Sequence, residues 1–284
     1  MKHWAQQRMI YGLAAVPALL FLLFQIWPLG HAIQTAFTNE TGQWTLEPAR
    51  RVWGDPLFRR SLGYSFLIPV VSVALEAGAG VAMALWFYFG LGRARGFWRT
   101  IALIPFAVPE IVYLLTMKLV FRQNGYLNSL LWHVGGSEAT VGWLEPGTPL
   151  MVGVVILVDA WRVTPIVLLI VLAALEQVPE SYLEAARIDG ASVGQIAWRI
   201  LMPLILPALL VALALRAVDA FRIFATPLVL VGIDALPVLT SVAYHYQEFA
   251  RDGAAANVAA LTLAFTLLLL TGLTLLGMKR RRSS

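Results

Sequence analysis

Apolar residues in this chain gather in six long runs that are separated by shorter polar segments. A helix needs roughly 20 apolar residues to cross the hydrocarbon core of a bilayer, and each run is about that long or longer. The pattern therefore predicts an all-α integral membrane protein with about six transmembrane helices. The runs cover approximately residues 9–30, 63–90, 100–121, 149–175, 203–233 and 255–278.

The first run could be mistaken for a secretory signal peptide, because Lys2 and Arg8 precede it. The run from Met9 to Leu29 is longer than the apolar part of such a peptide, and no convincing small-residue cleavage site follows it. We therefore expect an uncleaved first span.

The composition agrees with a membrane protein. Of the 284 residues, 59% are hydrophobic and 13% are charged, whereas a soluble domain carries about 25% charged residues. The formal net charge is +5, but the basic residues stand mostly at the ends of the spans. Their placement indicates membrane topology, and we expect no nucleic-acid partner.

The distribution of lysine and arginine predicts the orientation of the chain. With six spans and a cytoplasmic N-terminus, the inside segments hold eleven of these residues and the outside segments hold six. Cytoplasmic loops are normally the ones enriched in positive charge. Four arginines between residues 50 and 60 oppose this bias, but they lie in the longest loop, where the rule is weakest. Both termini are therefore expected to be cytoplasmic.

Several kinds of chemistry are not expected from this chain. It has no cysteine, which excludes disulfides and thiolate metal sites, and its four histidines lack metal-ligand spacing. Gly272 and Gly277 are spaced as in a phosphate-binding loop, but Met278 stands where that loop needs lysine. No catalytic constellation appears. We expect neither a bound metal or cofactor nor an enzyme, and any ATP must be bound by another chain.

The polar segment 176–207 has the chemistry of two short helices with a sharp bend. Ser181 followed by Glu184 has the spacing of a capping box, which predicts a helix starting near Tyr182. Gly190 is placed to end that helix in the left-handed conformation. The segment is too polar to span the bilayer.

The second half of the same segment repeats the capping pattern. Ser192 followed by Gln195 predicts another helix start, and Pro203 and Pro207 then mark the entry into the fifth span. We therefore expect a small helical knob on the cytoplasmic face.

Within this knob Glu184-Ala185-Ala186 is followed by Gly190, Ile200 and Pro203. The spacing of these residues resembles the EAA loop of permease subunits of binding-protein-dependent ABC importers. Met202 stands where the family usually has leucine, and Ala197 where sugar permeases often have an aromatic residue. The resemblance implies that the loop couples the permease to an ATPase subunit. The implied coupling residues are Glu184, Ala185, Ala186, Asp189, Gly190, Ile200 and Pro203.

Further segments are similar to carbohydrate permeases such as those of maltose, trehalose and glycerol-phosphate importers. They are the segments 55–62 and 125–128, Trp161 with Pro165, and residues 216–224. One departure is the replacement of the usual Gly-Gly-Pro after the fifth span by residues 232–237. The resemblance implies one permease domain over residues 1–284, with core spans at about 63–278, an extra span at about 9–30 and the coupling loop at about 176–207.

The family also implies the partner proteins, the location and the substrate of this chain. The expected partners are a second homologous permease subunit, two ABC ATPase subunits that bind ATP and magnesium, and an extracytoplasmic solute-binding protein. The expected location is the cytoplasmic membrane of a bacterium or archaeon. The expected substrate is a carbohydrate that moves inward by alternating access.

Charged residues inside the spans are candidates for the substrate path. Each would cost about 2.5–3.5 kcal/mol if it faced lipid, so they should face the bundle interior or a wet path. Arg216, Asp219 and Arg222 are spaced three apart and can pair, and Asp159 and Arg162 have the same spacing. The candidates are Arg162, Arg216, Asp219, Arg222, Glu110, Trp161, Tyr113 and Phe221.

Two interpretations of these residues stay open at this point. They can form structural pairs that hold helices together, or some can line a sugar path, and Glu76 is a weaker candidate for the same role. Balanced charge favours a neutral mono- or oligosaccharide over a phosphorylated one. The alternatives for the whole chain are an ABC permease for another solute, an ATP-independent transporter or channel, and a membrane enzyme. No internal repeat supports a secondary transporter.

Overall fold

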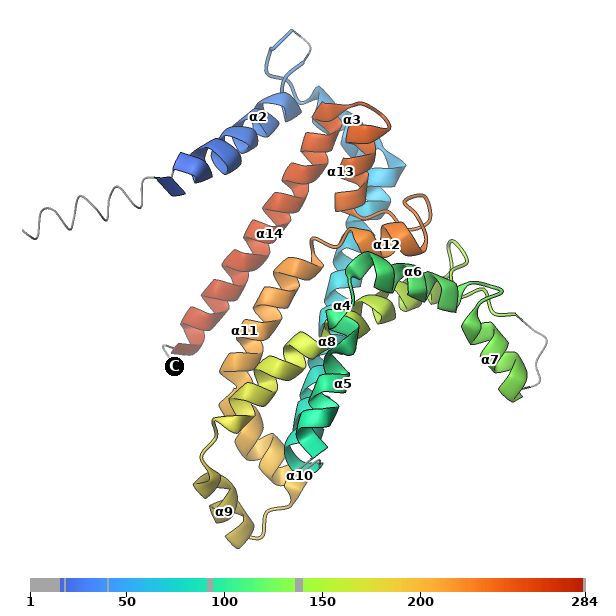
Figure 1. Ribbon diagram of the computed structural model, residues 1–284. Helices are drawn as coiled ribbons and strands as arrows, with labels where there is room; N and C mark the ends of the chain where they lie inside the picture. Colours follow the sequence, from blue (N-terminus) through green and yellow to red (C-terminus); the bar gives the residue numbers. More distant parts are fainter. Residues whose placement is uncertain (1–15, 18, 40, 91–93, 136–139, 283–284) are drawn as a thin grey trace, which may run out of the picture. The chain divides into compact units, whose positions relative to one another are not determined.

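The computed structural model describes residues 16–17, 19–39, 41–90, 94–135 and 140–282. The described residues form helices, with one isolated antiparallel bridge between Thr38 and Trp44 (Figure 1). In chain order the helices are η1 (Leu22–Ile26), α2 (Trp27–Ala36), α3 (Glu47–Gly54), α4 (Pro56–Gly90), α5 (Arg95–Ala107), α6 (Glu110–Phe121), α7 (Tyr126–Gly135), α8 (Pro149–Glu176), α9 (Glu180–Ile188), α10 (Val193–Gln195), η3 (Ile196–Leu201), α11 (Met202–Ala220), α12 (Ala225–Leu230), α13 (Leu239–Glu248) and α14 (Gly253–Arg282).

Four helical stretches within the described residues are long and apolar enough to cross a membrane. They are Leu19–Ala36, Pro56–Gly90, Pro149–Glu176 and Val193–Ala220. The pair Gly96–Ala107 and Glu110–Gly135 counts as a fifth span if it is taken together, and Gly253–Leu269 is a shorter apolar helix. The all-helical membrane fold expected from the six apolar runs is confirmed, although several boundaries differ.

Some boundaries move because helices extend into segments expected to be loops. The first apolar helix runs on to Ala36, and α4 begins at Pro56, seven residues before the predicted start. Helices α7 and α13 lie in segments expected to be connecting loops. Both are about ten residues long, which is too short for a span of roughly 20 residues and so gives a weak pattern in the sequence.

Two of the predicted spans are interrupted. The third bends by 91° between α5 and α6. Val108, which precedes Pro109, is extended with φ −73° and ψ 134°, because a residue before proline is disfavoured in the helical conformation. The predicted fifth span, 203–233, ends at Ala220. Its last turn tightens, with Arg222 N donating to Asp219 O at 3.0 Å, as helix ends often do.

The chain divides into two compact units. The first comprises Met1–Arg59 and Leu239–Phe265, and the second comprises Arg60–Val238 and Thr266–Ser284.

The first unit is held by polar contacts between its two chain segments. Asn257 Nδ2 donates to Thr35 Oγ1 at 2.5 Å, and the Tyr246 hydroxyl donates to Asp55 Oδ2 at 2.5 Å. Burial, together with this hydrogen bond, raises the pKa of Tyr246. The tyrosine therefore stays protonated, and remains a donor to Asp55, across the ordinary pH range.

The second unit is organised around α8. Most of this helix is buried, as expected for a helix that is hydrophobic on all sides. One cluster of buried apolar residues surrounds its first half and includes Ile68, Leu114 and Leu236. Another surrounds its second half and includes Phe87, Leu183 and Ile205. Between these two clusters lie the charged residues of the spans.

Candidate functional site

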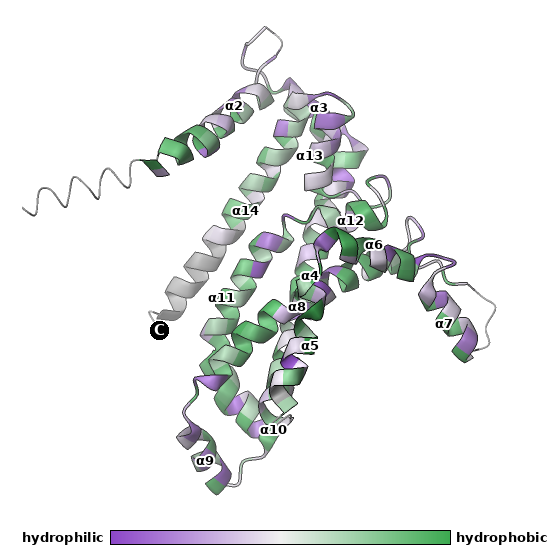
Figure 2. Ribbon diagram, in the orientation of Figure 1, coloured by the Kyte–Doolittle hydropathy of each residue, from purple (hydrophilic) through white to green (hydrophobic). Residues whose placement is uncertain are grey.

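A polar cavity of about 220 Å³ lies within the second unit. It is formed by the start of α6, the middle of α8, the end of α11 and the turn that follows α11. Figure 2 shows α11 as mainly hydrophobic, with hydrophilic residues near this end. The lining residues are Glu110, Asp159, Arg162, Arg216, Asp219, Ala220, Arg222, Ile223, Phe224 and Ala225.

Arg216 is the centre of a buried ion-pair network in the cavity wall. Its Nε and Nη2 atoms donate to the two carboxylate oxygens of Glu76 at 2.6 and 2.8 Å. Its Nη1 donates to Asp219 Oδ2 at 2.5 Å, and its Nη2 also reaches Asp159 Oδ2 at 3.3 Å. The network therefore ties α4, α8 and α11 together through one guanidinium.

The network has a buried part and a solvent-exposed part. The side chains of Glu76, Asp159 and Arg216 are 0%, 6% and 4% exposed, whereas that of Asp219 is 68% exposed. Thr226 Oγ1 donates to the other oxygen of Asp159 at 3.4 Å. Asp219 thus presents a solvated carboxylate at the cavity while its neighbours stay in the interior.

Arg162 pairs with a residue different from the one expected. The sequence spacing predicted a pair with Asp159, but Arg162 Nη2 lies 3.3 Å from Glu110 Oε1 on α6, while Asp159 contacts Arg216. The Nε atom of Arg162 is buried and has no hydrogen-bond partner among the described residues. Leaving such a buried donor without a partner costs about 1–3 kcal/mol.

Arg222 lies in the turn after α11 instead of inside a span. Its side chain is exposed, lines the cavity, and forms no ion pair with any described residue. It provides a guanidinium that is free to bind a solute.

The three aromatic candidates do not line this cavity. Tyr113 is 5% exposed and its hydroxyl donates to Val158 O at 2.9 Å. Phe221 is buried and packs edge-on against Phe66, with ring centroids 5.5 Å apart. Trp161 is half-exposed but lies in a separate apolar groove between α4, α5 and α8.

Glu76 was underweighted by the sequence pattern. Its only signal was an acid within an apolar run, and its partner Arg216 is 140 residues away. A fully buried carboxylate needs a partner, so this acid implied an arginine in a neighbouring helix without indicating which one.

Residues 176–207, here called the coupling segment, form two helices joined by a tight bend at Gly190, which has φ +75°. Ala191 N donates to Ala186 O at 2.9 Å, and Gly190 N donates to Arg187 O at 3.1 Å. These are the two bonds of a Schellman motif. Ser192 and Gln195 form the predicted capping box, so this helix start is confirmed.

The predicted capping box at Ser181 is wrong. Helix α9 starts at Glu180, and its N-cap is Pro179, with no side-chain hydrogen bond. Pro179 has φ −60°, and proline is well accommodated at a helix start. Because the helix begins at the next residue, Ser181 lies inside its first turn. The second helix also differs from the expectation, because α10, η3 and α11 form one continuous stretch from Val193 to Ala220.

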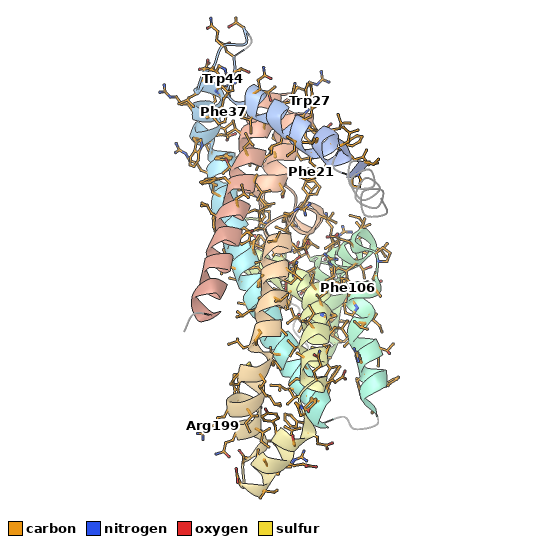
Figure 3. The ribbon with its side chains drawn as sticks, turned by 90° about the vertical axis from the view of Figure 1, so that its left-hand side faces the viewer. Phe21, Trp27, Phe37, Trp44, Phe106 and Arg199 are labelled. Carbon is orange, nitrogen blue, oxygen red and sulfur yellow. The ribbon has the colours of Figure 1, made fainter. Side chains whose placement is uncertain are left out.

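The exposed surface of the coupling segment is partly apolar. Leu183 and Ala186 pack into the core below it, while Ile188 and Trp198 are 86% and 67% exposed. Figure 3 shows Arg199 directed away from the ribbon of η3. The segment lies beyond the ends of α8 and α11 (Figure 1) and has the mixed character of a protein-docking surface.

The remaining coupling candidates differ in their accessibility. Glu184 and Ala185 are exposed on α9, Asp189 is exposed at its C-cap, and Pro203 is exposed in the first turn of α11. Ile200 is half-buried in η3. The Glu184 side chain has no hydrogen-bond or ion-pair partner in the part of the chain that the structure describes, so it is free to contact another protein.

Asn128 organises the segment that follows α6. Its Nδ2 donates to Gln123 O and Val141 O at 2.8 and 2.9 Å. Its Oδ1 accepts from Val141 N and from Trp143 Nε1. This asparagine therefore has a structural role, and fixes α7 to the loop around residues 141–143.

Comparisons with known proteins identify relatives of the whole arrangement. The family model for "Binding-protein-dependent transport system inner membrane component" matches residues 76–282. The chain is similar to the trehalose/maltose transport system permease protein MalF of Thermococcus litoralis, with 37% identity over 220 residues that cover 74% of this chain and 73% of that protein.

Two further comparisons agree with this result. The trehalose transport system permease protein SugA of Mycobacterium tuberculosis is 32% identical over 236 residues, which cover 80% of this chain and 74% of that protein. A chain in the crystal structure of a bacterial ABC transporter for the acidic polysaccharide alginate matches with a TM-score of 0.88, covering 100% of this chain and 99% of that one. At 19% identity, this likeness concerns the fold.

Proposed function

The chain belongs to the inner membrane components of binding-protein-dependent transport systems, and we propose that the solute it transports is a neutral carbohydrate. It is a multi-pass permease subunit of an ABC importer and a non-catalytic part of that machine. The family resemblance found in the coupling loop is thereby confirmed.

The charge balance of the cavity is the observation that carries the proposal. Three arginines and three carboxylates line it. A sugar hydroxyl both donates and accepts hydrogen bonds, so it can use carboxylate acceptors and guanidinium donors together. A cavity for an anion would be expected to hold an excess of arginine. The trehalose and maltose permeases among the relatives support the same substrate class.

The cavity also suggests which side chains contact the sugar. Glu110 and Asp219 are partly solvated, Arg222 is exposed, and Arg162 has a buried donor without a partner among the described residues. We assign these four residues to the substrate path. The burial and contacts of Tyr113 and Phe221 favour packing roles.

The coupling segment, residues 176–207, is proposed to dock on an ATPase subunit. ATP is then bound by that partner, and closure of the ATPase subunits moves the spans through α9 and α10. One chain presents one such segment, so two ATPases require a second permease subunit. The solute-binding protein is required by the family to which the chain belongs.

The orientation with both termini cytoplasmic is part of the proposal. It places the basic segment 91–99 and the coupling segment on the ATPase side. Reporter fusions after Ser284 and within the 140–148 loop test it. A C-terminal reporter that is active outside the cytoplasmic membrane would contradict this orientation.

Transport by the reconstituted importer tests the substrate. The complete complex is placed in vesicles with its binding protein, and uptake is measured for labelled trehalose, maltose, a uronate-containing oligosaccharide, phosphate and a polyamine. We expect uptake of a neutral sugar and, in Asp219→Asn, roughly tenfold weaker uptake with normal complex assembly. Selective uptake of phosphate, a polyamine or the uronate would contradict the proposal.

A further inference from the structure

Arg216 lines the sugar cavity, but each of its three nitrogens already donates to a carboxylate. Its side chain is 4% exposed. A sugar that bound this guanidinium would first have to break a buried ion pair. The residue is therefore placed to act on other residues.

Glu76 fixes the guanidinium from behind. It holds Arg216 with two parallel bonds of 2.6 and 2.8 Å, is completely buried on α4, and does not line the cavity. Because both Nε and Nη2 donate to Glu76, the planar guanidinium cannot rotate without breaking one of these two hydrogen bonds. Glu76 thus determines where the remaining N–H groups of Arg216 point.

Those N–H groups in turn orient the two carboxylates that face the cavity. Nη1 holds one oxygen of Asp219, and Nη2 holds one oxygen of Asp159. The other oxygen of Asp159 accepts from Thr226, whereas the Asp219 carboxylate remains largely open to solvent. The direction of the free acceptor of Asp219 is therefore set by Arg216.

We propose that the Glu76–Arg216 pair is the positioning element that sets the sugar selectivity of this permease. It aims the carboxylate of Asp219 at particular hydroxyl groups, and Glu76 acts without touching the sugar. This inference rests on the proposed sugar-transporting function. Selectivity follows because hydrogen bonds weaken steeply when their angle is poor, and a site built for a hydroxyl rejects an analogue that lacks it.

The experiment measures how well the complete importer discriminates between sugars. Uptake of the transported sugar is compared with uptake of its singly deoxygenated analogues, for wild type, Asp219→Asn and Glu76→Gln. The same binding protein is used throughout, so its own preferences cancel when each variant is divided by wild type. We expect Asp219→Asn to reduce discrimination against one analogue about tenfold, and Glu76→Gln to reduce it against the same analogue by a similar factor.

Two matched controls separate positioning from general loosening. Ser72→Ala removes a buried hydroxyl one turn before Glu76 on α4, whose oxygen has no hydrogen-bond partner among the described residues. Tyr113→Phe removes a buried hydrogen bond to α8 without changing charge. Both should leave the discrimination pattern unchanged, even if the yield of complex falls.

The outcomes distinguish this inference from the function on which it rests. If Asp219→Asn alters discrimination and an assembled Glu76→Gln complex does not, the positioning role is wrong and the sugar site remains. If neither variant alters discrimination, the positioning role is wrong and the cavity does not select between sugars, while the proposed function still stands on the uptake of the sugar itself. If Glu76→Gln does not assemble, Glu76→Asp replaces it. That variant keeps the charge but is one methylene shorter, and we expect a shift of about threefold against the same analogue. An unchanged pattern in Glu76→Asp would overturn the inference.

Discussion

The coupling segment and the polar cavity are stabilised by different kinds of interaction. The coupling segment depends on hydrogen bonds between residues three to five apart, such as those that close the bend at Gly190. The cavity depends on ion pairs between residues 52, 57 and 140 positions apart. One is a local structure in contact with water, and the other exists only when the four helices α4, α6, α8 and α11 have packed.

This difference separates the effects of mutations in the two regions. A solvated hydrogen bond contributes about 1 kcal/mol, and water replaces it when it is lost. A buried carboxylate that loses its partner has no such replacement. Changes in the coupling segment should therefore alter the transmission of force with little change in stability, whereas changes in the cavity wall should affect the fold itself.

The largest effect is expected from Arg216→Met. This change removes the cation that compensates Glu76 and should destabilise the second unit by about 3–5 kcal/mol. The yield of assembled complex and its thermal midpoint in lipid nanodiscs provide the measurement. Arg216→Lys is the control, because it keeps the charge but cannot form the two-pronged bond, and it should retain part of the stability. A Met variant as stable as wild type would show that the network is not structural.

Gly190→Leu should come next and should act on coupling. The glycine has φ +75°, and a Cβ at this position would meet only open space, so the cost is backbone strain of about 1–2 kcal/mol. The bend should open, and ATP hydrolysis stimulated by the binding protein should fall about tenfold while the complex still assembles. Gly190→Asn tolerates the left-handed conformation better and should retain more activity. Equal activity of all three proteins would remove the bend from the mechanism.

Glu184→Lys should weaken docking while leaving the fold intact. The Glu184 side chain is exposed, and no described residue pairs with it, so reversing its charge should change the thermal midpoint very little. We expect the affinity of the permease for its ATPase to fall by about tenfold, which corresponds to roughly 1.4 kcal/mol. Titration of the separated ATPase onto the permease measures this. Unchanged affinity would place the docking contact elsewhere on the segment.

Ser192→Ala should have the smallest effect and offers the cleanest control. It removes the cap of α10 and should cost about 1 kcal/mol of local stability, seen as faster amide hydrogen exchange at the start of that helix. Ser181→Ala tests the same substitution where the sequence pattern suggested a cap and the structure has none. It should change nothing, and an equal effect of both substitutions would contradict the assigned helix starts.

The coupling segment could be predicted in most of its details because its determinants are adjacent in the sequence. The bend at Gly190 and the cap at Ser192 each depend on a few neighbouring residues. The error at Ser181 is also local, since the helix begins at Glu180, directly after Pro179, and Ser181 therefore lies inside the first turn.

The charged residues of the cavity could be predicted, but not their pairing, and the three aromatic candidates lie outside the cavity. The cost of burying charge singled out Arg162, Arg216 and Asp219 without any structure. The partners Glu110 and Glu76 come from other helices, and no spacing rule along the chain connects them. The spacing of Asp159 and Arg162 therefore suggested a pair that packing replaced. The break after Ala220 was missed for a related reason, because hydropathy alone continues through it.

The π-helical stretch η3 gives the joint between the coupling segment and α11 a mechanical property of its own. A π turn holds about one residue more than an α turn, so this part of the helix contains an extra residue that can be redistributed along it. Shifting that extra residue along the helix turns whatever lies beyond it by about 100° per residue, with a rise of about 1.5 Å. We therefore expect a displacement of α9 to reach the charged end of α11 as a rotation of that helix.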